Sequence, residues 1–181
     1  MRLVLAGAIA TAASAPAVAF AVDYMSAEQA AQLIFPDADT FQAREFDLDA
    51  TQLQALGAQG IRGRSAHWRV RVALRAGQPL GYVVSDEVLG KFELISYAVG
   101  IGLDGAVRQV EILSYRESHG GEVRLPAWRR QFVGKTAASP LRVGEDIANI
   151  SGATLSCSHL AEGVRRIVAI VDLAKKLGLF P

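Results

Sequence analysis

The sequence predicts an α+β domain in which helices flank a mainly antiparallel, twisted sheet. Three observations support this class. Apolar and polar residues alternate in the middle of the chain, an Asp-Gly pair separates two apolar runs there, and a long amphipathic helix follows near the C-terminus. With 181 residues, no internal repeat and no dividing linker, the chain has room for a targeting segment and one domain with a full core.

Residues 1–21 are predicted to be a secretory signal peptide. A positive start at Arg2 is followed by an apolar run over residues 3–13 and by two small-x-small cleavage patterns, which end at Ala19 and Ala21. Cleavage would leave a periplasmic domain over residues 22–181 with no membrane span. The alternative is an uncleaved anchor, which needs about 20 predominantly apolar residues to cross a bilayer.

Residues 26–62 are predicted to form an N-terminal helical segment. Ser26 is suited to cap a first helix that runs to Phe35, and Pro36 ends it. A second helical stretch is expected over residues 49–56, and the glycines beyond it predict a loop.

The sheet is predicted from four runs of strand-like sequence, over residues 68–74, 80–88, 92–101 and 107–115. The first alternates apolar and polar side chains, which is the period of a half-buried strand. Gly77 and Pro79 predict a turn after it, and Asp104-Gly105 is a strong hairpin signal between the last two strands.

A polar loop over residues 116–126 and a short helical stretch over residues 127–132 are expected next. The last helix is the clearest, because apolar residues recur at helical spacing from Leu160 to Leu177 and Gly178 stops them. The core of the domain is therefore predicted to span residues 66–178.

Composition excludes several functions. The formal net charge of +1 and the absence of a basic stripe argue against a nucleic-acid binder. Cys157 is the only cysteine, so the domain has no internal disulfide, and it is expected to be a buried thiol. The three histidines, His67, His119 and His159, lack ligand spacing, which argues against a metal site.

The most specific feature is the stretch Ser151-Gly152-Ala153-Thr154-Leu155-Ser156, just before the last helix. Together with its flanks, over residues 145–157, it resembles the flavinylation motif of the FMN-binding domain family, in which a threonine is esterified to the phosphate of FMN. Two upstream segments, residues 115–124 and 128–135, resemble that family in the expected order. The resemblance covers roughly residues 80–172. Taken alone, the motif also fits a loop entering a helix, with Ser156 or Ser158 as its cap.

The family includes the flavin subunits of the Na⁺-pumping NADH:quinone reductase and of Rnf complexes. The resemblance implies covalent FMN on Thr154 and a loop from Glu117 to Gly121 that lies against the isoalloxazine ring. Trp128 is expected either to pack on the flavin or to belong to the core, and Lys135 either to contact the phosphate or a loop carbonyl or to be solvated. No catalytic residue is predicted, and the predicted cofactor-binding residues are Glu117, Ser118, His119, Gly120, Gly121, Trp128, Lys135, Ser151, Gly152, Ala153, Thr154, Leu155 and Ser156.

The chain departs from the family pattern at two places. Many members carry an aspartate three positions before the Ser/Thr of the motif, where this chain has Ala148, with Asp146 two residues earlier. Gly120-Gly121 replaces the more usual Gly-Leu-Gly turn.

The function implied is that of an exported electron carrier, which shuttles electrons between a membrane-bound donor and a periplasmic or quinone-linked acceptor. A flavin transferase is an implied partner. Whether the protein reduces a terminal substrate itself stays open. The alternatives are a membrane-anchored subunit of an Rnf-like redox complex and a noncovalent flavin-binding or sensory module.

Overall fold

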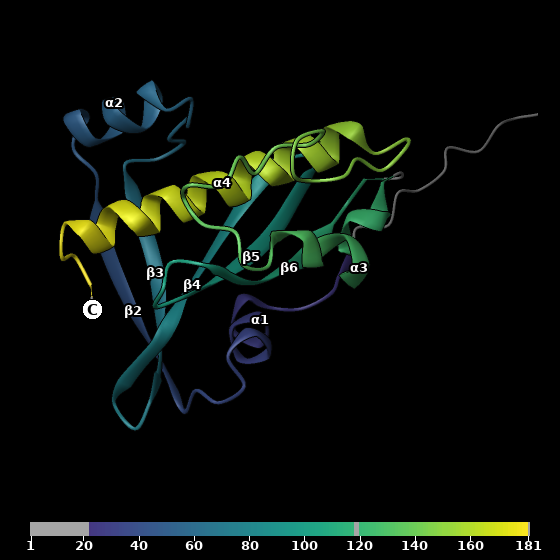
Figure 1. Ribbon diagram of the computed structural model, residues 1–181. Helices are drawn as coiled ribbons and strands as arrows, with labels where there is room; N and C mark the ends of the chain where they lie inside the picture. The colour runs from purple at the N-terminus through teal and green to yellow at the C-terminus, as the bar shows by residue number, and fades with distance from the viewer. Residues whose placement is uncertain (1–21, 118–119, 181) are drawn as a thin grey trace, which may run out of the picture.

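A six-stranded antiparallel sheet forms the centre of the computed structural model, which describes residues 22–117 and 120–180 (Figure 1). The predicted signal peptide, residues 1–21, lies outside the described residues. The strand order is β1-β6-β5-β4-β3-β2, and helices lie on both faces, so the α+β prediction is confirmed. The strands are β1 Val22–Asp23, β2 Thr40–Asp47, β3 His67–Arg75, β4 Gln78–Leu89, β5 Leu94–Gly102 and β6 Val107–Tyr115.

The edge strand β2 corrects the prediction of a helical segment over residues 26–62. It pairs with β3 along its whole length, from Thr40 opposite Leu74 to Asp47 opposite His67. Its side chains are mostly exposed, so its sequence carries little of the alternation that marks a half-buried strand. Pairing with β3, which is distant in sequence, therefore decides its conformation.

The two predicted N-terminal helices are present, as α1 Ala27–Ile34 and α2 Ala50–Ala58. Each begins with a capping box. The side chain of the cap residue accepts a hydrogen bond from the backbone N–H of the third helical residue, a glutamine, and the side chain of that glutamine accepts one from the backbone N–H of the cap residue. Ser26 caps α1 and Asp49 caps α2. Helix α1 packs against β5 and β6 on one face of the sheet, where Phe35 is fully buried.

The long helix α4, Thr154–Lys176, crosses the other face of the sheet and packs on β4 and β5 (Figure 1). Gly163 allows this close approach, because a Cβ there would lie 2.2 Å from the hydroxyl of Tyr97. On the same face Arg166 reaches Asp86 with an Nη2–Oδ2 distance of 2.5 Å, which ties the helix to β4 through a buried ion pair. The helix ends before Gly178, whose φ of +68° suits the left-handed position that follows many helices.

Three short turns of helix follow β6: η1 Gly121–Arg124, α3 Pro126–Arg129 and η2 Arg130–Phe132. The helical stretch predicted over residues 127–132 is thus present as two pieces, and the predicted loop over residues 116–126 contains η1. Asp104-Gly105 connects β5 to β6 as predicted. The turn predicted at Gly77 and Pro79 connects β3 to β4 and consists of Ala76 and Gly77, while Pro79 lies inside β4.

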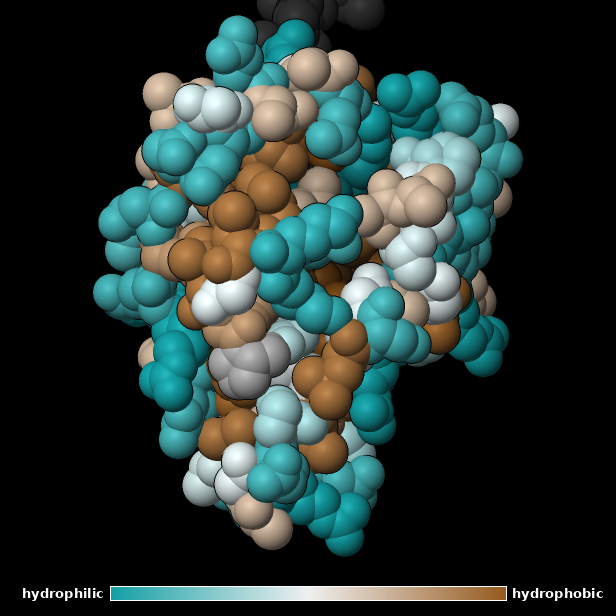
Figure 2. Space-filling model, turned by 60° about the vertical axis from the view of Figure 1, so that its left-hand side comes forward, coloured by the Kyte–Doolittle hydropathy of each residue, from teal (hydrophilic) through white to brown (hydrophobic). Residues whose placement is uncertain are grey.

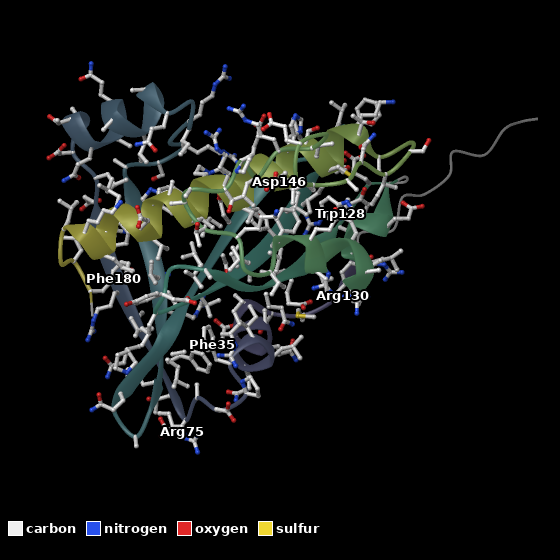
Figure 3. The ribbon with its side chains drawn as sticks, viewed as in Figure 1. Phe35, Arg75, Trp128, Arg130, Asp146 and Phe180 are labelled. Carbon is white, nitrogen blue, oxygen red and sulfur yellow. The ribbon has the colours of Figure 1, made fainter. Side chains whose placement is uncertain are left out.

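Aromatic residues close the core at the end of α4. Phe180 packs between Phe46 of β2 and Tyr82 of β4, with ring centroids 5.6 and 4.7 Å away. Figure 3 places Phe180 at the opposite end of the molecule from Trp128. Figure 2 brings the Phe180 side forward, and apolar side chains reach the surface there in a band between polar ones.

Candidate functional site

The first turn of α4 carries the threonine that the motif singles out. Thr154 is the first residue of the helix, which corrects the expectation that the helix begins a few residues after it. The N-cap is Ala153, and among the residues that the structure describes no side chain makes a capping hydrogen bond here, so neither Ser156 nor Ser158 has the capping role of the alternative interpretation. Helix α4 thus presents its first backbone N–H groups without the side-chain partner that α1 and α2 have.

The hydroxyl of Thr154 is exposed and held by one side chain. The amide Nδ2 of Asn149 donates to Thr154 Oγ1 over 3.0 Å. Because this bond uses a lone pair of the hydroxyl oxygen, the O–H proton stays free to leave. The preceding Gly152 has a φ of +81°, a conformation that favours glycine and turns the chain into the helix.

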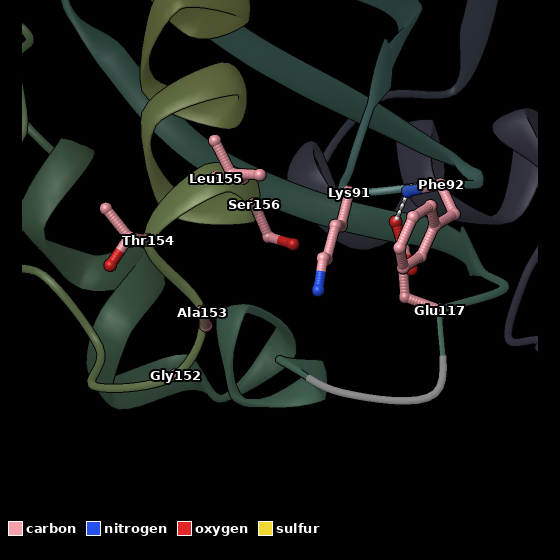
Figure 4. Close-up of a pocket in the computed structure, with 8 residues that line it drawn as sticks. All are labelled: Lys91, Phe92, Glu117, Gly152, Ala153, Thr154, Leu155 and Ser156. Atoms are coloured by element: carbon pink, nitrogen blue, oxygen red, sulfur yellow. Dashed lines mark hydrogen bonds between the residues drawn. The ribbon is translucent and has the colours of Figure 1, made fainter.

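Thr154 lies on the rim of a cavity of about 470 Å³ (Figure 4). One wall is the turn before α4 together with the first residues of that helix. The other is formed by the β4–β5 loop and by Glu117, which follows β6. Lys91 extends between Ser156 on one side and Phe92 with Glu117 on the other. The lining residues are Lys91, Phe92, Glu117, Gly152, Ala153, Thr154, Leu155 and Ser156.

Glu117 fixes the shape of the β4–β5 loop. Its Oε1 accepts hydrogen bonds from the backbone N–H groups of Phe92, at 2.5 Å, and of Glu93, at 3.0 Å. Gly90 leaves room for this carboxylate, because a Cβ at Gly90 would lie 2.6 Å from Glu117 Oε1. Hydrogen bonds to a charged acceptor are stronger than neutral ones. Glu117 therefore holds the wall that carries Lys91 in place.

Behind the cavity, the lining residue Ser156 forms a buried pair of hydroxyl groups with Tyr115. Ser156 Oγ and Tyr115 Oη lie 3.3 Å apart, and both side chains are buried. Burial raises the pKa of Tyr115. Gly120 packs directly against this pair, because a Cβ there would lie 2.8 Å from Tyr115 Oη and 3.4 Å from Ser156 Oγ. Because the pKa of Tyr115 is raised, its phenol is neutral at physiological pH and acts as a hydrogen-bonding group.

Residues 90–169, which include this cavity, match the family model described as the FMN-binding domain. Residues 90–169 belong to that family. The family resemblance predicted from the sequence is confirmed, and the match supports FMN as the cofactor.

Two solved structures share the fold of this chain. The crystal structure of NqrC from Shewanella oneidensis is 16% identical with a TM-score of 0.52, covering 74% of this chain and 80% of NqrC. A subunit of the Na⁺-translocating NADH-quinone reductase from Parabacteroides distasonis is likewise 16% identical with a TM-score of 0.52, covering 79% of this chain and 81% of that protein. Among curated proteins no sequence gives a significant match.

The residues at the cavity fit a phosphate and a flat ring system. A volume of about 470 Å³ lies within the range of known small-molecule sites. The uncapped start of α4 supplies the N–H groups and the positive dipole end that favour a phosphate. Lys91 adds a cation, and Phe92, whose side chain is largely exposed, offers an aromatic face on the opposite wall. The Thr154 hydroxyl, a helix end that favours an anion and a cavity of small-molecule size therefore occur together.

Most of the predicted cofactor-binding residues lie at this cavity. Gly152, Ala153, Thr154, Leu155, Ser156 and Glu117 line it, and Gly120 packs beneath it. Ser151 stands in the exposed turn before it, and Gly121 begins η1. Ser118 and His119 lie outside the described residues.

Trp128 and Lys135 have structural partners and do not line the cavity. The indole of Trp128 is buried edge-on against Phe132 and donates its Nε1–H to the carbonyl of Ala148 over 2.7 Å. Lys135 Nζ lies 2.9 Å from Asp146 Oδ2. Both residues therefore support the segment that leads into the motif, on the α4 side of the sheet where Figure 3 labels Trp128 and Asp146.

Asp146 organises that segment. Burial alone would raise the pKa of its carboxyl group, but hydrogen bonds from the backbone N–H of Arg142 and from Lys135 outweigh this effect, so the pKa lies below its ordinary value of 3.8. The carboxylate is thus charged near neutral pH and bridges two parts of the loop over residues 135–146.

Lys91 and Phe92 line the cavity although the sequence did not predict them as site residues. They come before a predicted strand and at its first position, and nothing in their own pattern marks a binding site. Gly90 was the available signal, because a glycine that interrupts an apolar strand pattern often marks a close approach of another group. Here that group is Glu117.

Neither a metal cluster nor a membrane-spanning helix occurs in the described part of the chain. Within residues 22–117 and 120–180, no group of three or more His, Cys, Asp or Glu side chains is arranged to hold a metal ion. Across the same ranges, no helix is long and apolar enough to cross a membrane.

Proposed function

We propose that this protein is an exported electron carrier in which FMN is attached to Thr154 through a phosphoester. One observation carries the proposal: an exposed threonine hydroxyl stands at the uncapped N-terminus of a 23-residue helix, on the rim of a cavity that fits the cofactor. The membership of residues 90–169 in the FMN-binding domain family supports FMN as the group attached.

The attachment reaction makes one bond and breaks one. Thr154 Oγ1 bonds to the phosphorus of the FMN half of FAD, the bond to the bridging pyrophosphate oxygen breaks, AMP leaves, and the hydroxyl proton is released. A flavin transferase supplies the FAD and the base. Asn149 holds Oγ1 in place with its amide donor while leaving the proton free. No oxidant or reductant is consumed in this step.

The cavity walls act on the attached group by position and charge. Backbone N–H groups in the first turn of α4 would stabilise the attached phosphodiester, which carries one negative charge. Lys91 places a cation between the α4 wall and the wall formed by Phe92 and Glu117, where it would stabilise negative charge (Figure 4). When bound, FMN supplies reversible uptake of one or two electrons. The chain itself therefore needs only to hold the ring and set its charge environment.

We place this carrier outside the cytoplasm, with a membrane-bound donor and a periplasmic or quinone-linked acceptor. The signal-peptide pattern over residues 1–21 supports export. The solved structures of the same fold include a subunit of a Na⁺-translocating NADH-quinone reductase, which supports a membrane redox partner. Covalent attachment suits such a location, because a dissociated cofactor would be lost.

The test is the intact mass of the exported protein after co-production with a flavin transferase. Wild type should gain the mass of FMN minus one water, and its yellow colour should survive denaturation. Thr154→Ala should gain nothing, whereas Thr51→Ala, which removes an exposed threonine hydroxyl from α2, away from the motif, should be modified like wild type. An unmodified wild type, or a modified Thr154→Ala, contradicts the proposal.

The membrane-anchored alternative is favoured by one observation. Val22 of β1 pairs with Tyr115, whose hydroxyl lies 3.3 Å from that of the cavity-lining Ser156. The first described residue, Val22, therefore lies at the cavity end of the sheet, and a retained anchor would hold the cavity near the membrane. N-terminal sequencing of the exported protein decides between the two: a start at residue 20 or 22 supports the free carrier, and an intact N-terminus supports the anchored subunit.

A further inference from the structure

A second cavity, of about 600 Å³, lies beside α4, and its lining residues include four arginines. We call it the arginine groove. Four guanidinium groups face it, and Glu162 is the one carboxylate among its described lining residues. The arginines come from three separate segments: Arg62 follows α2, Arg142 precedes the motif, and Arg165 and Arg166 belong to α4.

Two of the four arginines are not neutralised within the described part of the chain. Asp86 pairs with Arg166 at 2.5 Å, and Glu145 contacts Arg142 at 3.3 Å in an exposed pair that contributes little. By contrast, Arg165 donates only to the carbonyl groups of Gln59, at 2.7 Å, and Gly60, at 3.4 Å. For Arg62 no hydrogen bond or ion pair occurs within residues 22–117 and 120–180. The groove therefore carries excess positive charge.

The groove adjoins the proposed flavin cavity. His159, which lines the groove, donates from Nδ1 to the carbonyl of Leu89 at 2.5 Å. Leu89 ends β4, and Lys91 and Phe92 of the cavity follow it directly. Along α4, His159 lies five residues after Thr154, which is about 7.5 Å of helix axis. A partner bound in the groove would thus stand next to the cavity.

Exposed apolar side chains occupy the border between the two cavities. Phe92 is 71% exposed and Leu89 is 51% exposed. Protein interfaces combine apolar and aromatic contacts with arginine, and this border supplies both within a short distance. The fixed position of Arg165 adds to this, because a side chain already held by two carbonyl groups loses little freedom on binding.

We propose that the arginine groove docks an acidic surface of the redox partner protein, next to the flavin. This inference rests on the proposed function, and it gives that function's partner a chemical character. Guanidinium groups also bind phosphate. However, these four arginines come from three segments around an open hollow, and three of them already use some of their N–H donors within the chain. This spaced arrangement suits several separate carboxylates better than one phosphate. Opposite charges near the cofactor steer the encounter and fix its orientation.

The experiment uses a small acidic flavodoxin as probe and the double variant Arg62→Gln/Arg165→Gln. The matched control is Arg44→Gln/Arg75→Gln, which makes the same change of charge on the β2–β3 edge of the sheet. Calorimetry measures binding of the probe, and separately of pyrophosphate, by flavinylated and unmodified protein at low and high salt. Stopped-flow absorbance measures electron transfer between the flavinylated protein and the probe.

Wild type and control should bind the probe in a salt-dependent manner, and the groove variant should lose about tenfold in association rate at low salt, with a flatter salt dependence. Equal binding by all three proteins, or salt-independent binding by wild type, overturns the proposal. The proposal is also overturned if pyrophosphate binds tightly in the groove while the groove variant binds the flavodoxin probe as wild type does. Because binding is also measured without flavin, a failure of flavinylation would count against the proposed function and leave the groove tested.

Discussion

Replacing Asn149 by alanine should slow the attachment of FMN without unfolding the protein. The structure gives Thr154 Oγ1 one side-chain partner, the Nδ2 group of Asn149 at 3.0 Å. Both side chains are exposed, so the change leaves no buried polar group unsatisfied and its cost is that of one positioning hydrogen bond. Such a bond contributes about 1 kcal/mol. If that energy is lost in the transition state, the rate falls about fivefold.

The assay is the initial rate of mass gain with a limiting amount of flavin transferase and excess FAD. Asn149→Asp is the informative companion, because its carboxylate can accept the hydroxyl proton and hold the side chain in a similar place. We expect it to recover part of the rate and to make that rate depend on pH. Thr51→Ala serves as the control, because it removes an exposed side-chain hydroxyl from α2, outside the motif and the cavity. An Asn149→Ala rate equal to that of wild type, with Thr154→Ala inert, would refute the positioning role.

Three other predictions concern stability. Gly120→Ala should lower the free energy of unfolding by about 1–3 kcal/mol in urea titrations, because φ is +82° and the new Cβ would lie 2.8 Å from Tyr115 Oη; an unchanged midpoint would contradict the packing described. Arg166→Met should cost about 3 kcal/mol, since it leaves the carboxylate of Asp86 partly buried without its cation, and the loss should disappear when Asp86 is also replaced by leucine. The depressed pKa of Asp146 means that its charged form stabilises the fold above about pH 3.8 and that this stabilisation is lost as the pH falls through the folded-state pKa. Asp146→Asn should therefore be less stable than wild type at pH 7, and the gap should close in acid unfolding curves below pH 4.

The sequence predicts most of the sheet because each of its buried strands contains a clear apolar run. Alternation places β3, and the Asp104-Gly105 pair locates the connection from β5 to β6. Edge strand β2 was missed because nearly all its side chains face solvent and its identity depends on β3. A pattern that reports burial cannot reveal a strand that is hardly buried.

The candidate site was predicted from its motif, but its shape could not be. The motif identifies Thr154, but the sequence pattern does not show that α4 begins at that residue. The first turn is polar on the side that packs inward, where Ser156 is hydrogen-bonded to Tyr115, so it lacks the apolar spacing that marks the rest of the helix. Lys91 and Phe92 stand on a loop that Glu117 fixes through the backbone N–H groups of Phe92 and Glu93, which are 25 and 24 positions away in sequence. Contacts over such separations are set by the fold and leave no local signal.

The first turn of α4 is poorly stabilised by local interactions, and the rest of the helix explains why the fold tolerates this. A missing side-chain cap costs about 1 kcal/mol, and α1 and α2 both avoid that cost. Further along α4, the contact of Gly163 with Tyr97 and the buried pair of Arg166 with Asp86 fix the helix on the sheet. Because those interactions lie two to three turns beyond Thr154, the helix end does not need a cap to stay in place. The N–H groups that a cap would have occupied are left for a ligand, so the absence of a local stabilising feature is itself part of the site.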